Sequence, residues 1–331
     1  MATFLSTDRM SPELRARIEA SVHGRRAAPG ARLAPRSLGL LRIGAILTIV
    51  AAISWLFLLR QRAGQERETQ RAALLSRVKR EAASLSNTQR QIPGRVQSWL
   101  ERSAATYEGD YVAEKLRAGD GLAATLARSS IYVRGPLASF LSASGTQESA
   151  STSSKDAFVL CLFEPPATRS EKTLRAKARA ALGGGERMES TVHVQRLYHA
   201  LAGLPFLSPN WARRVVEAET QHDITRLERT FERAPLKAAK LAAQASLLLF
   251  AMDEADGTGP TELDGERAHH VRVGLVDLDT EQLLLRLRRH VDPSWISANA
   301  RAEYASGIDS CALGADVRAA VTGQAVLEPA R

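Results

Sequence analysis

The longest apolar stretch of the chain lies near its N-terminus. No residue from Ile43 to Leu59 is charged, and Leu38 to Leu41 extend the apolar pattern beyond Arg42. A helix over residues 38–59 would rise roughly 33 Å, which is enough to cross a hydrocarbon layer of about 30 Å. The long segment before it and the absence of a small-residue cleavage site argue against a cleaved signal peptide. The pattern therefore predicts a single transmembrane helix that acts as a signal-anchor.

The residues after this stretch predict a helical stalk over 60–128. Apolar or small side chains recur there in alternating steps of three and four, as in a coiled coil. These positions are Leu75, Val78, Ala82, Leu85, Gln89, Ile92, Val96 and Trp99. Pro93 and Gly94 should divide the stalk into helices near 60–91 and 95–107. The seam can serve self-association or pair two helices of one chain, and both alternatives stay open.

A change in composition marks the start of a globular domain. Residues 129–155 predict a strand followed by a Ser/Thr-rich linker, because residues 142–155 have almost no apolar bulk. The domain itself is expected over 156–325. Its first element, from Ala157 to Phe163, is apolar on both faces and is interpreted as a central strand.

The clearest local pattern predicts a β-hairpin near residues 270–289. Apolar positions alternate on both sides of a turn at Asp279-Thr280-Glu281, namely Val271, Val273 and Leu275 before it and Leu283, Leu285 and Leu287 after it. Leu247 to Met252 predicts another strand. Helical patterns cover about 170–182, 190–202, 209–233 and 310–321.

Together these elements predict an α+β fold. It comprises the N-terminal transmembrane helix, the helical stalk and a C-terminal domain in which helices pack a small, mainly antiparallel sheet.

Charge refines this interpretation. The net charge is +9, and the excess of basic residues lies in the first 128 residues. Basic residues beside an apolar segment favour anionic lipid headgroups as the partner, rather than nucleic acid. We expect the short basic tail, residues 1–37, in the cytoplasm and the C-terminal domain in the periplasm or otherwise outside the cytoplasm, with the helix in the inner membrane.

The two cysteines are candidates for a disulfide. Cys161 and Cys311 would close a loop of about 150 residues in an oxidising compartment, which is worth roughly 5 kcal/mol on loop entropy alone. The alternative is that Cys161 is an ordinary buried thiol in the core.

Candidate metal ligands lie in a long acidic loop between two strands. Asp253, Asp256 and Asp264 are carboxylates of this loop, but their spacing is not that of a calcium-binding loop, and a solvated acidic loop is the alternative. His269 and His270 should point to opposite faces of a strand and so cannot share a metal ion. No spacing typical of a hydrolase, a redox protein or a dinucleotide-binding protein occurs, so we predict no catalytic residue and no cofactor.

These observations predict a single-pass, membrane-anchored envelope protein. Its outer α+β domain would bind another protein or give structural support without catalysis, through a protein partner or through self-association of the stalk. One alternative is a membrane-bound sensor that couples the outer domain to the N-terminal tail. The other alternative is a hydrolase with an unrecognised site.

Overall fold

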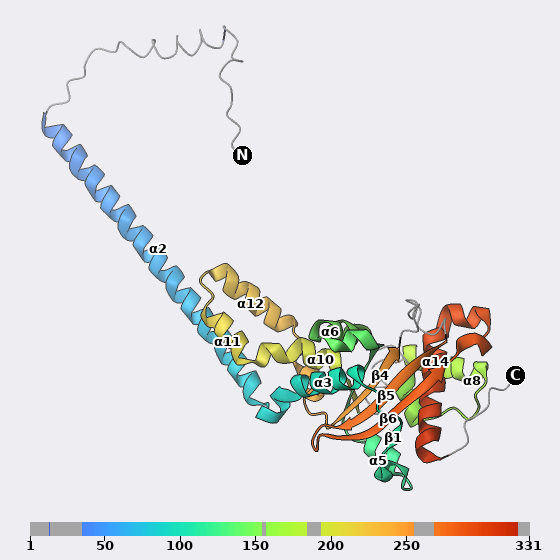
Figure 1. Ribbon diagram of the computed structural model, residues 1–331. Coiled ribbons are helices and arrows are strands. Elements are labelled where there is room, and N and C mark those ends of the chain that lie inside the picture. Colours follow the sequence, from blue (N-terminus) through green and yellow to red (C-terminus); the bar gives the residue numbers. More distant parts are fainter. Residues whose placement is uncertain (1–12, 14–34, 154–156, 184–192, 255–267, 324–331) are drawn as a thin grey trace. The chain divides into compact units, whose positions relative to one another are not determined.

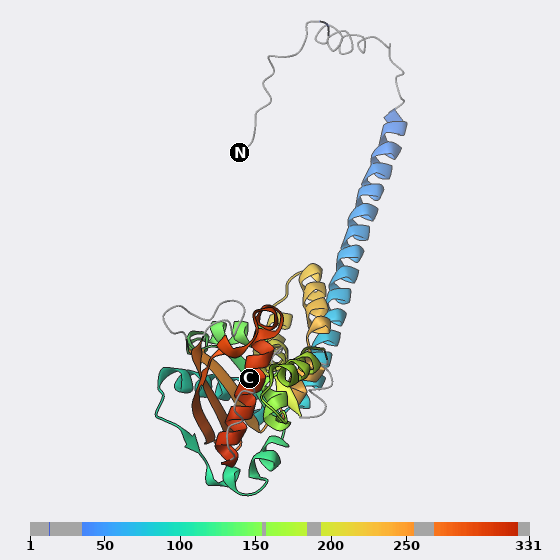
Figure 2. The same ribbon diagram turned by 90° about the vertical axis from the view of Figure 1, so that its right-hand side faces the viewer.

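The structure is a computed structural model that describes residue 13 and residues 35–153, 157–183, 193–254 and 268–323 (Figures 1 and 2). It divides into two compact units, residues 1–66 and residues 67–331. The long helix α2, Pro35–Ala83, begins in the first unit and ends in the second.

The structure contradicts the prediction of a transmembrane helix. Within the described ranges, no helix is long and apolar enough to cross a membrane. The predictions that depend on this helix are wrong as well: a single-pass, signal-anchored envelope protein or membrane-bound sensor, placed in the inner membrane with a periplasmic domain.

The second unit is built on one mixed sheet of six strands in the order β1-β6-β5-β4-β2-β3. The strands are β1 (Tyr111–Val112), β2 (Ser130–Pro136), β3 (Val194–Arg196), β4 (Leu247–Glu254), β5 (His269–Asp277) and β6 (Gln282–Val291). The hairpin predicted near 270–289 is present as β5 and β6, and the strand predicted from Leu247 is β4. The sheet is mixed rather than mainly antiparallel, since β2 pairs in parallel with both β3 and β4. The helices between these strands provide the crossovers that parallel pairing needs.

Helices and short 3-10 turns cover both faces of this sheet (Figure 1). The helices are α3 (Asn87–Ala105), α4 (Glu114–Arg117), α5 (Gly121–Leu126), α6 (Ala143–Thr152), α7 (Phe158–Phe163), α8 (Glu171–Gly183), α10 (Leu197–Gly203), α11 (Pro209–Val216), α12 (Gln221–Arg233), α13 (Leu236–Ala242) and α14 (Ala298–Thr322). The 3-10 turns are η2 (Leu137–Leu141), η4 (Leu204–Leu207) and η5 (Pro293–Trp295). α14 continues through Gly307, so the helix predicted over 310–321 is the second half of a longer one.

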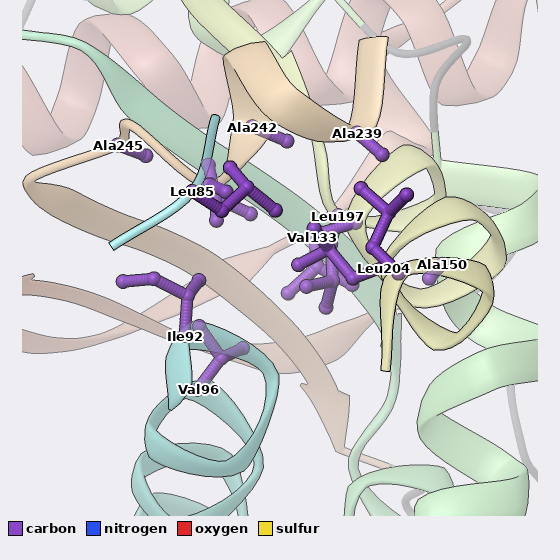
Figure 3. Packing of buried hydrophobic residues seen from close by; sticks show 14 of the residues in the cluster. Leu85, Ile92, Val96, Val133, Ala150, Leu197, Leu204, Ala239, Ala242 and Ala245 are labelled. Carbon is purple, nitrogen blue, oxygen red and sulfur yellow. The ribbon is translucent and has the colours of Figure 1, made fainter. Parts of the chain in front are cut away.

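The two faces of the sheet carry separate hydrophobic cores. One core joins the face that carries Val133 and Phe250 to α3, α6, α10 and α13, and Figure 3 shows part of it, with Ile92 and Val96 of α3 near Leu85. The other core joins the opposite face to α7 and α14. The alternation of side chains along each strand sends successive residues to different cores.

The seam predicted for the stalk packs within the chain. Val78, Leu85, Ile92 and Val96 are buried in the first core together with residues of the sheet. The helix break lies at residues 84–86 instead of at Pro93, because the Ser86 side chain forms a capping box at the start of α3. Self-association of the chain stays a prediction.

Two segments adopt helices where the sequence predicted other structures. The segment predicted as a central strand forms α7 from residue 158 to residue 163. This helix is buried on both sides, between the sheet and α14, and is therefore apolar all round. The expected linker contains α6, whose small side chains allow close packing. A Cβ added to Gly135 of β2 would lie only 2.4 Å from Ser149 Oγ of α6.

Candidate functional site

Strand β4 ends on two acidic residues whose side chains point to opposite faces of the sheet. Asp253, one of the candidate metal ligands, lies on the α14 face and is 3% exposed. Its Oδ1 accepts a hydrogen bond from Arg134 Nη2 at 2.8 Å and lies 3.1 Å from His269 Nε2, and its Oδ2 accepts one from Arg134 Nε at 3.1 Å. Both carboxylate oxygens are therefore held by protein groups.

Most of the acidic loop, residues 255–267, lies outside the described residues. The search for a metal site therefore concerns the rest of the chain. No group of three or more His, Cys, Asp or Glu side chains able to hold a metal ion occurs there. Asp256 and Asp264 lie outside the described residues. Metal binding by this loop stays a prediction.

The environment of Asp253 keeps its carboxyl group ionised. Burial alone would raise its pKa, but the charge of Arg134 and the hydrogen bond with His269 outweigh burial and lower the pKa to about 2. Asp253 and Arg134 thus form a buried, bidentate ion pair that joins β4 to β2.

Asp309 of α14 belongs to the same buried cluster but is poorly satisfied. It is 2% exposed, and its Oδ2 has no hydrogen-bond partner among the described residues. Burial raises the pKa of Asp309 to about 7, although the charges of Arg134, His269 and Arg169 oppose this and that of Asp292 adds to it. The next residue, Ser310, accepts a hydrogen bond from Arg134. The bond between Arg134 of β2 and Ser310 holds α14 on the sheet. All groups of the cluster except Asp292 and Arg169 are buried, so the cluster is closed to a ligand.

The two cysteines lie beside this cluster. Cys161 of α7 and Cys311 of α14 form a disulfide, with their Cα atoms 5.0 Å apart. The bond joins two helices that pack on the same face of the sheet.

On the opposite face, Glu254 binds two arginines of the hairpin. Arg272 of β5 donates to one carboxylate oxygen, and Arg288 Nε of β6 donates to the other at 2.9 Å. Burial would raise the pKa of Glu254, but the hydrogen bonds from Arg288 and Arg272 lower it. Arg272 Nη1 also donates to the carbonyl oxygens of Ser103 and Ala104 at 3.0 and 3.1 Å. These bonds satisfy carbonyl groups at the C-terminal end of α3 and fix that end over the hairpin.

A cavity of about 390 Å³ lies where α3 meets this face of the hairpin. Aromatic rings and guanidinium groups share its wall. The residues concerned are Trp99, Arg102, Tyr107, Phe250, Arg272 and Arg286. The cavity is thus both apolar and rich in positive charge.

Gly274 of β5 makes room for the aromatic ring of Phe250. The two residues are paired across β4 and β5, and a Cβ added to Gly274 would lie 2.1 Å from Phe250 Cζ. The ring therefore lies across the strand and forms part of the cavity wall.

Replacement of Gly274 by valine should displace the Phe250 ring and destabilise the fold. We expect a loss of about 1–3 kcal/mol in the free energy of unfolding, as for other overpacked cores, measured by urea denaturation. Gly94 of α3 is the matched control position, because a Cβ there meets nothing within 4 Å. Unchanged stability of the Gly274→Val variant would contradict this account of the packing.

The arginines of the cavity lie near its aromatic rings. The Arg102 guanidinium lies 4.3 Å from the Trp99 ring centre, and those of Arg272 and Arg286 lie 5.6 and 6.0 Å from the Tyr107 ring centre. Tyr107 donates a hydrogen bond to Asp110. Burial and this bond raise the pKa of Tyr107 to about 12, so its ring stays neutral at physiological pH.

The pattern of residues along the chain did not predict this cavity. Its residues come from α3, from the segment after α3, from β4 and from the hairpin. Two of them, Trp99 and Arg286, are 187 positions apart in the sequence. One signal was available: Arg286 and Arg288 alternate with Leu285 and Leu287, which marks one face of the strand as basic.

Comparison with known proteins gives no relative from which a function can be transferred. No protein-family model matches the chain, and neither a curated protein nor a solved structure matches it.

Proposed function

We propose that the second unit is a binding domain for a small anionic molecule with a flat, apolar body. The observation that carries this proposal is that three aromatic rings and three guanidinium groups line one cavity of about 390 Å³. Binding is non-covalent and involves no reaction.

The size and wall of the cavity fit this class of ligand. Small-molecule sites are commonly about 300–1,000 Å³, mostly apolar, with a few polar groups that orient the ligand. The half-buried rings of Trp99 and Tyr107 offer flat apolar surfaces on which an aromatic ring packs well, and the buried ring of Phe250 adds to the apolar wall. Guanidinium groups bind carboxylate and phosphate oxygens in a bidentate manner.

The charge of the wall also favours an anion. Arg102, Arg272 and Arg286 line the cavity with Glu108 as the one acidic lining residue in the described chain. Glu254 binds Arg272 from outside the lining and is itself shared with Arg288. Arg102 stacks on Trp99 and is exposed, so its guanidinium can turn toward a bound anion.

Isothermal titration calorimetry of the full chain tests this proposal with 2-naphthoate as the probe and neutral 2-naphthamide as its matched analogue. We expect 2-naphthoate to bind more tightly than 2-naphthamide and its affinity to fall with added salt. The Arg102→Gln variant should bind 2-naphthoate about tenfold more weakly, in line with the loss of one charge-assisted hydrogen bond. Trp99→Leu should weaken both probes several-fold.

The control is Arg117→Gln, which removes the same charge from an exposed position of α4 outside the cavity. Its affinity for 2-naphthoate should match that of the unmodified chain. If neither probe binds, or if Arg102→Gln and Arg117→Gln behave alike, the proposal is wrong.

A further inference from the structure

Glu108 holds one of the cavity's arginines by an exposed contact. Its Oε2 lies 2.5 Å from Arg286 Nη1, and both residues line the cavity. The Glu108 side chain is 69% exposed, whereas that of Arg286 is 22% exposed. An ion pair of this kind contributes little to stability, typically about 0–1 kcal/mol.

Arg286 has a second anchor that does not depend on Glu108. Its Nε donates a hydrogen bond to the carbonyl oxygen of Gly109 at 2.8 Å, and its guanidinium lies near the Tyr107 ring. The guanidinium therefore stays at the cavity wall if the Glu108 carboxylate moves away, and Nη1 then becomes available to another acceptor.

The backbone at Gly109 separates Glu108 from the next fixed residue. Gly109 has a φ of +93°, in the region that favours glycine. Asp110 beyond it is held by Tyr107, by Arg289 Nη1 at 2.7 Å and by the backbone N–H of Arg288 at 3.0 Å. Glu108, by contrast, is held by one side-chain contact in the described chain, the one with Arg286.

We propose that Glu108 occupies the anion subsite of the cavity and that the carboxylate of the ligand replaces it on Arg286. This inference rests on the proposed function and specifies it further. The ligand is a carboxylic acid, because it takes over a contact that a carboxylate of the protein already makes. Glu108 acts as a competitor that lowers the affinity for every anion and leaves that for neutral molecules unchanged.

The test compares Glu108→Gln with Glu101→Gln, which removes the same charge from an exposed position of α3 outside the cavity. Calorimetry of the full chain should show that Glu108→Gln binds 2-naphthoate roughly fivefold more tightly than the unmodified chain, since a modest ion pair no longer has to be broken. Its affinity for 2-naphthamide and both affinities of Glu101→Gln should stay unchanged. In an Arg286→Gln background, which should weaken 2-naphthoate binding, Glu108→Gln should have no further effect.

The outcomes separate this inference from the proposed function. If 2-naphthoate binds and Arg102→Gln weakens it, but Glu108→Gln binds no more tightly than Glu101→Gln, the subsite assignment is wrong and the binding function stands. If Glu108→Gln binds 2-naphthoate more tightly than both the unmodified chain and Glu101→Gln, and 2-naphthamide binding is unchanged, the assignment is supported. If no form of the chain binds either probe, both are overturned.

Discussion

Replacement of Asp309 by asparagine is expected to stabilise the chain at and above pH 7. The pKa of Asp309 is raised from 3.8 to about 7 in the folded chain, so between these values the folded state binds more protons than the unfolded state. Stability therefore falls as pH rises from about 4 to about 7, and the loss is complete above pH 7. A difference of about 3 pKa units corresponds to roughly 4 kcal/mol.

Urea denaturation at several pH values from 5 to 8 measures this effect. The unmodified chain should lose stability as pH rises, and Asp309→Asn should lose much less, so the difference between the two should be smaller at pH 5 than at pH 8. Asp292→Asn is the control, because Asp292 is exposed and faces the same cluster. Parallel pH profiles of the unmodified chain and Asp309→Asn would contradict the buried, poorly satisfied state of this carboxyl group.

The second large effect is expected at Arg134. Replacement by methionine leaves the carboxylate of Asp253 buried without its bidentate partner, which typically costs about 3–5 kcal/mol. The Arg134→Met, Asp253→Leu double variant should recover most of this loss, since an apolar pair of similar volume removes the uncompensated charge.

Urea denaturation at pH 7 measures both variants. Arg226→Met is the control, because Arg226 forms an exposed pair with Asp223 on α12 and should cost at most about 1 kcal/mol. An Arg134→Met variant as stable as this control would show that the Arg134–Asp253 pair does not hold the sheet. Acid should weaken the unmodified chain as well, since the lowered pKa of Asp253 gives stability that is lost as pH falls from about 4 toward 2.

The sequence predicted those elements whose two faces differ in polarity. Val271, Val273 and Leu275 alternate with other residues because one face of β5 packs in the same core as α14. The hairpin could therefore be predicted, and in the structure Val273 pairs with Leu287 and Leu275 with Leu285. His269 and His270 lie on opposite faces as expected, the first beside Asp253 and the second 5.0 Å from the ring of His290.

Elements that are buried all round could not be assigned in the same way. The segment 157–163 is apolar on every side because it lies between the sheet and α14, and periodicity does not separate such a helix from a central strand. The apolar residues of α2 were interpreted as a membrane span on length and hydropathy alone. Within the described residues, however, no helix is long and apolar enough to cross a membrane.

The cavity could not be found from local patterns because no local segment contains it. Trp99 lies in α3 and Tyr107 follows this helix. The other lining residues, Phe250, Arg272 and Arg286, come from three strands that meet only in the folded sheet. The partners of Asp253 could not be predicted from local patterns either. Asp253 was a candidate metal ligand in the sequence, and only the fold shows that Arg134 and His269 bind it.

Photolabelling of the full chain with 4-azidobenzoate, followed by mass spectrometry of tryptic peptides, shows where the chain binds an aromatic carboxylate. We expect the label in the peptides that carry the lining residues, namely 96–102, 103–115, 241–267, 268–272 and 273–286, which contain Trp99, Tyr107, Phe250, Arg272 and Arg286. Excess 2-naphthoate should prevent this labelling, and 2-naphthamide should do so less well. Labelling that spreads over other peptides, or that 2-naphthoate does not prevent, would contradict a binding site in this cavity.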